Sequence, residues 1–338
     1  MYLDLWDRYP PSHWHFQPKN SIASDGGTST DRPTNSIAQR LIAMDARQKF
    51  PALLDRYLPE LAIAALLGIM YGPLMFHWVD GWLNKSISIE HEYFSHGLIG
   101  IPFAAYIVWG DRHRWQNLSD RANPIGAVFI GLAGVFYLSG LWDLVNLSLP
   151  VMLVGICLWF KGLEGLRLFW FPLLLVLLAT PNDLPYLIAP YTMWLQSAIA
   201  GTAGFILTVF GLDVTVADIY LLVGGRMVEV APHCAGIKML FTTIYVALML
   251  LYWTGVISSR GTSIMFLSCA IAISVATNVV RNTILTFFYG AGRDDLFHWM
   301  HDSWGGDAIS AIMLVLLIPT LTLVEKVASL LFPETEAS

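Results

Sequence analysis

Nine apolar blocks, each near the length that crosses a bilayer, restrict the fold of this chain more than any other feature. They occupy residues 60–78, 94–109, 125–142, 147–160, 167–181, 188–210, 236–257, 262–288 and 306–331. A helix needs about 20 apolar residues to cross a hydrocarbon core about 30 Å thick. Lipid offers the backbone no hydrogen bonds, and the alternating pattern of barrel strands is missing from the sequence. The blocks therefore predict an all-α polytopic membrane protein.

Composition agrees with a membrane protein and argues against a nucleic-acid-binding protein. Of the 338 residues, 56% are hydrophobic and 13% are charged, whereas soluble domains carry about 25% charged residues. The net charge is −6 and no basic patch is interleaved with aromatic residues. This argues against nucleic acid as a partner and makes membrane lipid the expected surrounding.

The block at 188–210 is the least lipid-like for its length, because it contains Gln196, Ser197, Gly201, Thr202 and Gly204. We predict that this helix does not span the membrane, which leaves about 8 transmembrane helices. Cytoplasmic segments usually carry the excess of Lys and Arg. With an inward N-terminus, all but five of the 19 basic residues fall in cytoplasmic segments. The five at or toward the outer face are Lys85, Arg226, Lys238, Arg281 and Arg293.

Three regions follow from the same pattern. Residues 1–58 are polar, contain the low-complexity run SIASDGGTSTDRPTNS and lack the apolar stretch of a cleavable signal. They predict a disordered cytoplasmic tail. Residues 59–331 are expected to form the transmembrane domain, and residues 332–338 a short C-terminal tail.

The segment from Asp213 to Ala231 differs from the apolar blocks, because it is rich in β-branched residues around Gly224 and Gly225. It predicts a short extracytoplasmic β-hairpin, since strand backbone cannot lie exposed in lipid. The hairpin would lead directly to His233 and Cys234, at the mouth of the helical bundle.

Cys234 differs from the other two cysteines in its surroundings. Cys157 and Cys269 lie inside apolar runs and are expected to be small buried hydrophobic residues. Cys234 lies between the predicted hairpin and a membrane span. The chain has no CxxC pair, which argues against a thiolate zinc site and a disulfide framework. Cys234 is therefore the candidate nucleophile.

Polar residues recur on one face of the helix expected at 262–288. Ser274, Asn278 and Arg281 are spaced i, i+4 and i+7. A charge at the centre of a membrane helix costs roughly 2.5–3.5 kcal/mol. Arg281 should therefore face a protein-lined or water-lined cavity, or else lie near the helix end and snorkel to the interface.

Two histidines follow that helix, in GAGRDDLFHWMHDSWGGD. His298 and His301 are three residues apart, so they share a face if the segment is helical. Taken alone, the segment is read equally well as a solvated loop with two ordinary histidines. Two predicted spans connect it to Cys234, which places it on the same membrane face.

A thiol becomes an effective nucleophile when a base or a positive charge lowers its pKa. In acyl transfer the thiolate attacks a peptide carbonyl, an imidazolium protonates the departing amine, and a guanidinium stabilises the oxyanion. Cys234, Arg281 and His301 supply these groups without a cofactor. His233, His298 and Asn278 are secondary candidates.

The chain resembles the exosortase and archaeosortase family, specifically its cyanoexosortase branch. The resemblance runs from about residue 60 to 325 and rests on FSHGLIGIPFAAYIVW, FPLLLVLLATPNDLP, VEVAPHCAGIK, NVVRN and HDSWGG. It implies an intramembrane cysteine protease or transpeptidase of the inner or plasma membrane, with its active site toward the extracytoplasmic face. Its partners would be exported proteins with a C-terminal sorting signal, whose tail it cleaves. The motifs match Cys234 to the nucleophile, Arg281 to the essential arginine and His301 to the essential histidine.

Two other functions fit parts of the sequence. A metal-dependent membrane hydrolase would use His298, His301 and Asp302, with His91 and His96 as further ligands, although HEYFSH lacks the i, i+4 spacing of a zinc helix. A membrane transporter would line its path with Asn278 and Arg281. The first predicts inhibition by chelators, and the second predicts no covalent intermediate.

Overall fold

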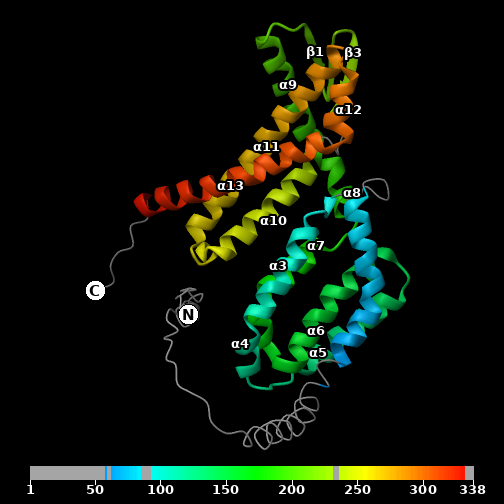
Figure 1. The fold of residues 1–338 in the computed structure, drawn as a ribbon, viewed down its shortest axis with the longest axis vertical. Coiled ribbons are helices and arrows are strands. Elements are labelled where there is room, and N and C mark those ends of the chain that lie inside the picture. The colour runs from blue at the N-terminus through cyan, green and yellow to red at the C-terminus, as the bar shows by residue number, and fades with distance from the viewer. Residues whose placement is uncertain (1–57, 59–61, 85–92, 231–235, 332–338) are drawn as a thin grey trace, which may run out of the picture. The chain divides into compact units, whose positions relative to one another are not determined.

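A computed structural model describes residue 58 and residues 62–84, 93–230 and 236–331 (Figure 1). It divides into two compact units, Met1–Phe76 and His77–Ser338. The first unit contributes the larger part of the helix Ala62–Leu83. The predicted tail at 1–58, apart from Leu58, and the predicted C-terminal tail at 332–338 lie outside the described residues.

The second unit begins with a group of helices that pack pairwise. They are α3 (Gly97–Gly110), α4 (Arg112–Asn117), α5 (Pro124–Leu138), α6 (Trp142–Leu168) and α7 (Trp170–Ala179). The helix α5 packs against α6, and α7 packs against both α3 and α6. The α5–α6 contact is close because a Cβ on Gly126 would lie only 2.4 Å from the backbone nitrogen of Trp159. Small residues let membrane helices approach in this way.

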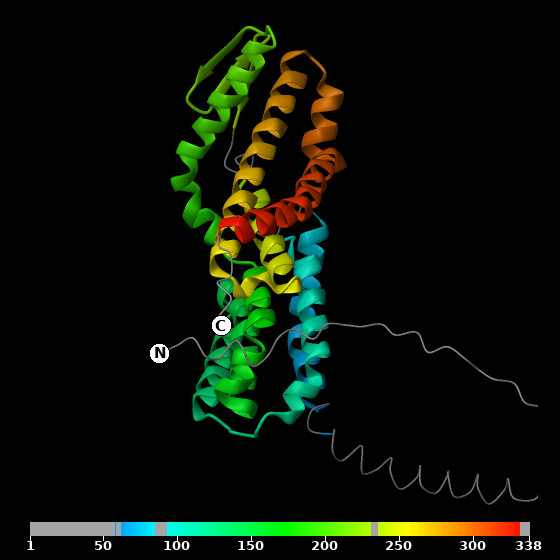
Figure 2. The same ribbon diagram turned by 90° about the vertical axis from the view of Figure 1, so that its left-hand side faces the viewer.

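A second group of helices surrounds α11. It contains α8 (Leu184–Ile188), the 3₁₀ turn η1 (Ala189–Thr192), α9 (Met193–Val209), α10 (Ile237–Trp253), the 3₁₀ turn η2 (Val256–Ser258), α11 (Arg260–Gly290), α12 (Asp294–Asp302) and α13 (Trp304–Leu331). The helix α11 packs against α9, α10, α12 and α13, and Figure 2 shows it between α9 and α12. Buried residues from α10, α11 and α13, including Leu251, Phe266 and Leu317, form the core of this group.

A three-stranded antiparallel sheet lies between α9 and α10 in the chain. Its strands are β1 (Val214–Ala217), β2 (Tyr220–Val223) and β3 (Arg226–Glu229), in that spatial order. Gly224 and Gly225 turn the chain between β2 and β3 with φ of 58° and 74°, the left-handed conformation that a tight hairpin turn requires. The predicted hairpin is confirmed, and β1 adds a third strand to it.

The mostly helical architecture is confirmed. The described residues contain 5 helices that are long and apolar enough to cross a membrane: Ala62–Leu83, Trp142–Leu168, Leu184–Val209, Arg260–Gly290 and Trp304–Leu330. The block at 188–210, predicted not to span, is therefore long and apolar enough to do so. Its polar Gln196 has no exposed surface, because the side chain turns toward protein. The count of about 8 spans stays a prediction.

Tyr245 of α10 joins α10 to α3 and α7. Its hydroxyl donates a hydrogen bond to the carbonyl oxygen of Leu175 at 3.0 Å. A Cβ built on Gly100 of α3 would lie 1.8 Å from the Tyr245 hydroxyl oxygen. The absence of a side chain at Gly100 thus permits the contact between α3 and α10 that brings the two helix groups together.

We expect Gly100→Ala to destabilise the protein by about 1–3 kcal/mol, because overpacking at a tight contact forces the tyrosine ring and backbone to shift. Gly134→Ala is the matched control, since a Cβ there meets no atom within 4 Å. Alanine at that helical position should be neutral or stabilise by up to about 1 kcal/mol. Unfolding in detergent measures both variants, and equal stabilities would contradict the packing described.

Candidate functional site

The polar face of α11 is turned into the protein. Ser274, Asn278, Asn282 and Thr286 are each at most 5% exposed, and their i, i+4 spacing aligns them on one side of the helix. The Asn282 side-chain amide donates to the Asn278 backbone oxygen at 2.9 Å and to its Oδ1 at 3.2 Å. The predicted inward direction is confirmed for Ser274 and Asn278, and Asn282 and Thr286 extend the same face.

Asn278 contacts the start of α10. Gly236 precedes that helix with a φ of 82°, and a Cβ on it would lie 2.6 Å from Cγ of Asn278. The backbone of Gly236 therefore lies directly against the asparagine side chain. Cys234 and His233 fall within residues 231–235, outside the described residues, but Gly236 follows Cys234 by only two positions.

Arg281 contacts the start of α13. A Cβ on Gly306, in the first turn of α13, would lie 3.6 Å from Nη2 of Arg281 and 2.9 Å from the carbonyl oxygen of Met300. Met300 directly precedes His301 near the end of α12. The half-buried Arg281 thus contacts protein at the start of α13.

The two histidines share one carboxylate. The helix α12 carries both His298 and His301, as their spacing suggested. Nδ1 of His301 lies 2.6 Å from Oδ1 of Asp302, and Nδ1 of His298 lies 2.7 Å from Oδ2. Hydrogen bonds from His301 and then from His298 hold the pKa of the Asp302 carboxyl below its usual value. Asp302 is therefore an ionised acceptor for both rings.

The sheet is attached to the α11–α12 end of the bundle. Arg226 of β3 forms an ion pair with Asp294, with Nη2 3.2 Å from Oδ2. It also donates to the Tyr289 carbonyl oxygen at 3.1 Å and lies over the Tyr289 ring at 4.6 Å. The hydrogen bond from Arg226 lowers the pKa of the Asp294 carboxyl. This attachment holds the first residue of β3 against the end of α11. The strand β3 precedes Cys234 in the sequence.

A cavity of about 190 Å³ lies near the starts of α3, α10 and α13 and is lined by both polar and apolar side chains. Its polar lining residues are Ser95, Lys238, Thr242, Asp307 and Ser310. Lys238 follows Gly236 by two residues, and Asp307 directly follows Gly306. The cavity is therefore lined by residues that neighbour Gly236 and Gly306 in the sequence.

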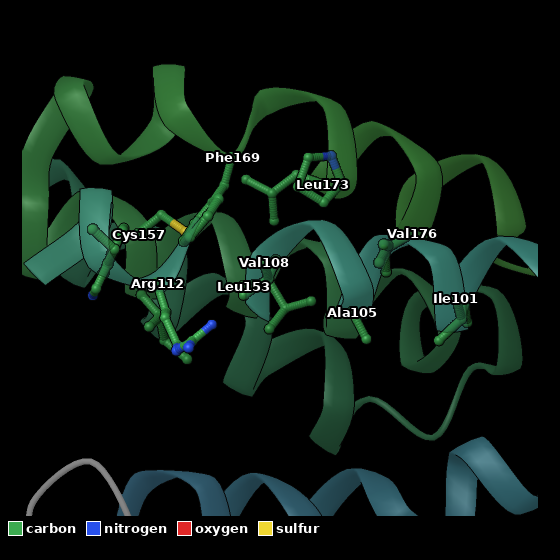
Figure 3. Close-up of a pocket in the computed structure, with 13 residues that line it drawn as sticks. Ile101, Ala105, Val108, Arg112, Leu153, Cys157, Phe169, Leu173 and Val176 are labelled. Carbon is green, nitrogen blue, oxygen red and sulfur yellow. The ribbon is translucent and has the colours of Figure 1, made fainter. Parts of the chain in front are cut away.

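A larger cavity of about 430 Å³ does not have the groups required of an active site (Figure 3). Cys157 lies in its wall with mainly apolar residues of α3, α6 and α7, and no histidine or carboxylate lines it. Cys157 is buried, as predicted. Cys269 is half-buried and packs against the core of α10, α11 and α13.

The proposed metal ligands do not form a metal site among the residues that the structure describes. That part of the chain holds no group of three or more His, Cys, Asp or Glu side chains suited to a metal ion. Nε2 of His96 lies 3.1 Å from the Leu178 carbonyl oxygen, and its ring lies 4.4 Å from the Tyr245 ring. His96 therefore joins α3 to α7 and α10. His91 lies outside the described residues.

Sequence reasoning missed three contributors to this site. It named Asp302 only as a metal ligand, and it gave no role to Gly236 or Gly306. Asp302 directly follows His301, and Gly306 belongs to the glycine pair after HDSW. The position of Asp302 beside a candidate base could have indicated its contact with His301. The glycines near the candidate site could have indicated close backbone packing there.

Comparison with known proteins identifies one family. A family model described as transmembrane exosortase (Exosortase_EpsH) matches residues 78–318, more than two thirds of the chain. The match includes α11, α12 and most of α13, together with residues 231–235. No curated protein and no solved structure matches the chain.

We expect Gly236→Ala to reduce activity and stability together. It places a Cβ at positive φ and 2.6 Å from Asn278 Cγ, so backbone strain of about 1 kcal/mol adds to an overpacking cost of about 1–3 kcal/mol. Gly225→Ala is the control, because its φ is also positive but nothing lies within 4 Å. Unfolding and cleavage assays of both variants separate strain from contact. Equal effects would contradict a specific role for the Gly236–Asn278 contact.

Proposed function

Since this chain belongs to the transmembrane exosortase family of cysteine transpeptidase-type enzymes, we propose that it cleaves the C-terminal sorting tail of exported proteins through a thioester on Cys234. The sequence motifs favour the cyanoexosortase branch of the family. Substrates with C-terminal sorting signals follow from membership of the family.

One observation supports this site above all others. Asn278 and Arg281 are three residues apart on α11, about 4.5 Å along its axis, and contact Gly236 and Gly306 respectively. Cys234 is two residues from Gly236, a distance that the chain spans with at most about 7 Å. His301 is five residues from Gly306. Both segments that carry the proposed reactive groups therefore meet α11 within one turn.

The chemistry proceeds in two steps. The Cys234 thiolate attacks the carbonyl carbon of the scissile peptide, and the carbonyl oxygen becomes an oxyanion beside the Arg281 guanidinium. The C–N bond then breaks, the His301 imidazolium protonates the departing amine, and the acyl group remains on sulfur. In the second step water or an acceptor amine gives its proton to His301 and attacks the thioester, which releases the Cys234 thiolate.

His301 is a better candidate for the base than His298. Its side chain is 31% exposed, whereas that of His298 is 67% exposed. The His301 ring also stacks on Phe297 at 5.3 Å, so its orientation is restricted. His233 directly precedes the nucleophile and stays a rival, although adjacent side chains tend to point apart.

We further propose that this end of the bundle faces the extracytoplasmic side. Arg226, Arg281 and Arg293 lie at or near the α11–α12 end, whereas Arg260 begins α11 at its opposite end. The cytoplasmic assignment of Arg112, Arg114, Arg121 and Arg167 follows the excess of basic residues on that side. Exported substrates would then meet the site after translocation.

The decisive prediction concerns tail removal from a co-expressed substrate with a C-terminal sorting tail, measured by intact mass. Cys234→Ser should abolish cleavage. His301→Ala should reduce the rate by about 10²–10⁴-fold, the usual contribution of general acid–base catalysis. Arg281→Ala should reduce it by about 10²–10³-fold, as loss of an oxyanion donor does.

Matched controls come from the other cysteines. Cys157→Ala and Cys269→Ala should cleave at nearly the wild-type rate, and chelators should not inhibit the wild type. Cleavage by Cys234→Ser would refute the thiol mechanism. Inhibition by a chelator together with full activity of Cys234→Ser would support the metal-dependent hydrolase instead.

A further inference from the structure

Asp302 occupies a position that neither the motifs nor the proposed reaction explains. Asp302 is the last residue of α12. Its carboxylate contacts both histidines through their Nδ1 atoms, at 2.6 Å for His301 and 2.7 Å for His298. An ionised carboxylate has no proton to donate, so each imidazole must carry a proton on Nδ1. In the neutral ring this leaves Nε2 unprotonated and basic.

The two histidines are not equivalent. The His301 ring is nearly parallel to Phe297, with 12° between their planes, while His298 meets Phe297 edge-on at 79°. His301 is also the less exposed of the two and follows Met300, whose carbonyl oxygen faces Gly306 beside Arg281. The ring that stacks on Phe297 is therefore the one nearer along the chain to Gly306, the residue that contacts Arg281.

We propose, on the basis of the proposed function, that Asp302 is a positioning residue that keeps His301 in its Nδ1–H tautomer and presents Nε2 to the Cys234 reaction. His298 holds the second carboxylate oxygen and so fixes the orientation of the carboxylate. When His301 gives its Nε2 proton to the departing amine, it returns to the neutral Nδ1–H form. Asp302 stays ionised throughout and does not touch the substrate.

The test is Asp302→Asn in the full-length protein in detergent. The amide has nearly the same shape, but its NH₂ group can donate to Nδ1 of His301 and favour the Nε2–H tautomer. We expect kcat to fall by about 10²–10⁴-fold, with KM changed less than about twofold because the substrate contacts remain. Asp302→Glu, which keeps the acceptor, should recover part of kcat. His298→Ala removes the contact between Nδ1 of His298 and the Asp302 carboxylate, and it should lower kcat by less than about tenfold.

A spectroscopic measurement separates positioning from folding. In ¹⁵N NMR spectra of histidine-labelled protein, with His301 assigned by comparison with His301→Ala, neutral His301 should be protonated on Nδ1 in the wild type and on Nε2 in Asp302→Asn. Asp295→Asn is the matched control, because it removes an exposed carboxylate from the same helix. It should change neither the tautomer nor kcat, and all variants should unfold at similar temperatures.

The possible outcomes separate a positioning role of Asp302 from the thiol mechanism of Cys234. An unchanged His301 tautomer in Asp302→Asn, or a kcat within about twofold of the wild type, overturns the positioning role of Asp302. A changed tautomer with an unchanged kcat also refutes His301 as the base. Activity that persists in Cys234→Ser refutes the thiol mechanism while leaving the spectroscopic result on Asp302 intact.

Discussion

The buried polar face of α11 is the constraint on which the rest of the site depends. Asn278 lies against the backbone of Gly236, and Arg281 lies against Gly306. Polar groups within a membrane are costly unless protein or water surrounds them. The starts of α10 and α13 can pack closely against this face because the glycine in each has no side chain.

This arrangement connects parts of the chain that are far apart in sequence. The sheet is attached to the end of α11 through Arg226, and β3 leads from there toward Gly236. On the other side α12 turns back and ends at Asp302, immediately before α13. Gly236, which follows Cys234, and Gly306, which follows His301, thus both contact one helix. Lys238 and Asp307, which come shortly after these two glycines, line one cavity.

The sequence predicted the helical class, the hairpin at Gly224 and Gly225, and the inward face of Ser274 and Asn278, because each depends on local periodicity or turn chemistry. The burial of Gln196 against protein could not be predicted from the composition of the block at 188–210. Close approaches at Gly236 and Gly306 depend on tertiary packing, and the sharing of Asp302 by two histidines depends on where α12 ends. These features could not be read from spacing alone.

The central claim is that Cys234 forms the acyl-enzyme at this site. The most direct measurement is peptide mass spectrometry of wild-type protein, acid-quenched during turnover of a tailed substrate. We predict a hydroxylamine-sensitive thioester that carries the substrate's N-terminal fragment on Cys234. A thioester on Cys157 or Cys269, or tail release with Cys234 unmodified throughout the time course, would contradict it.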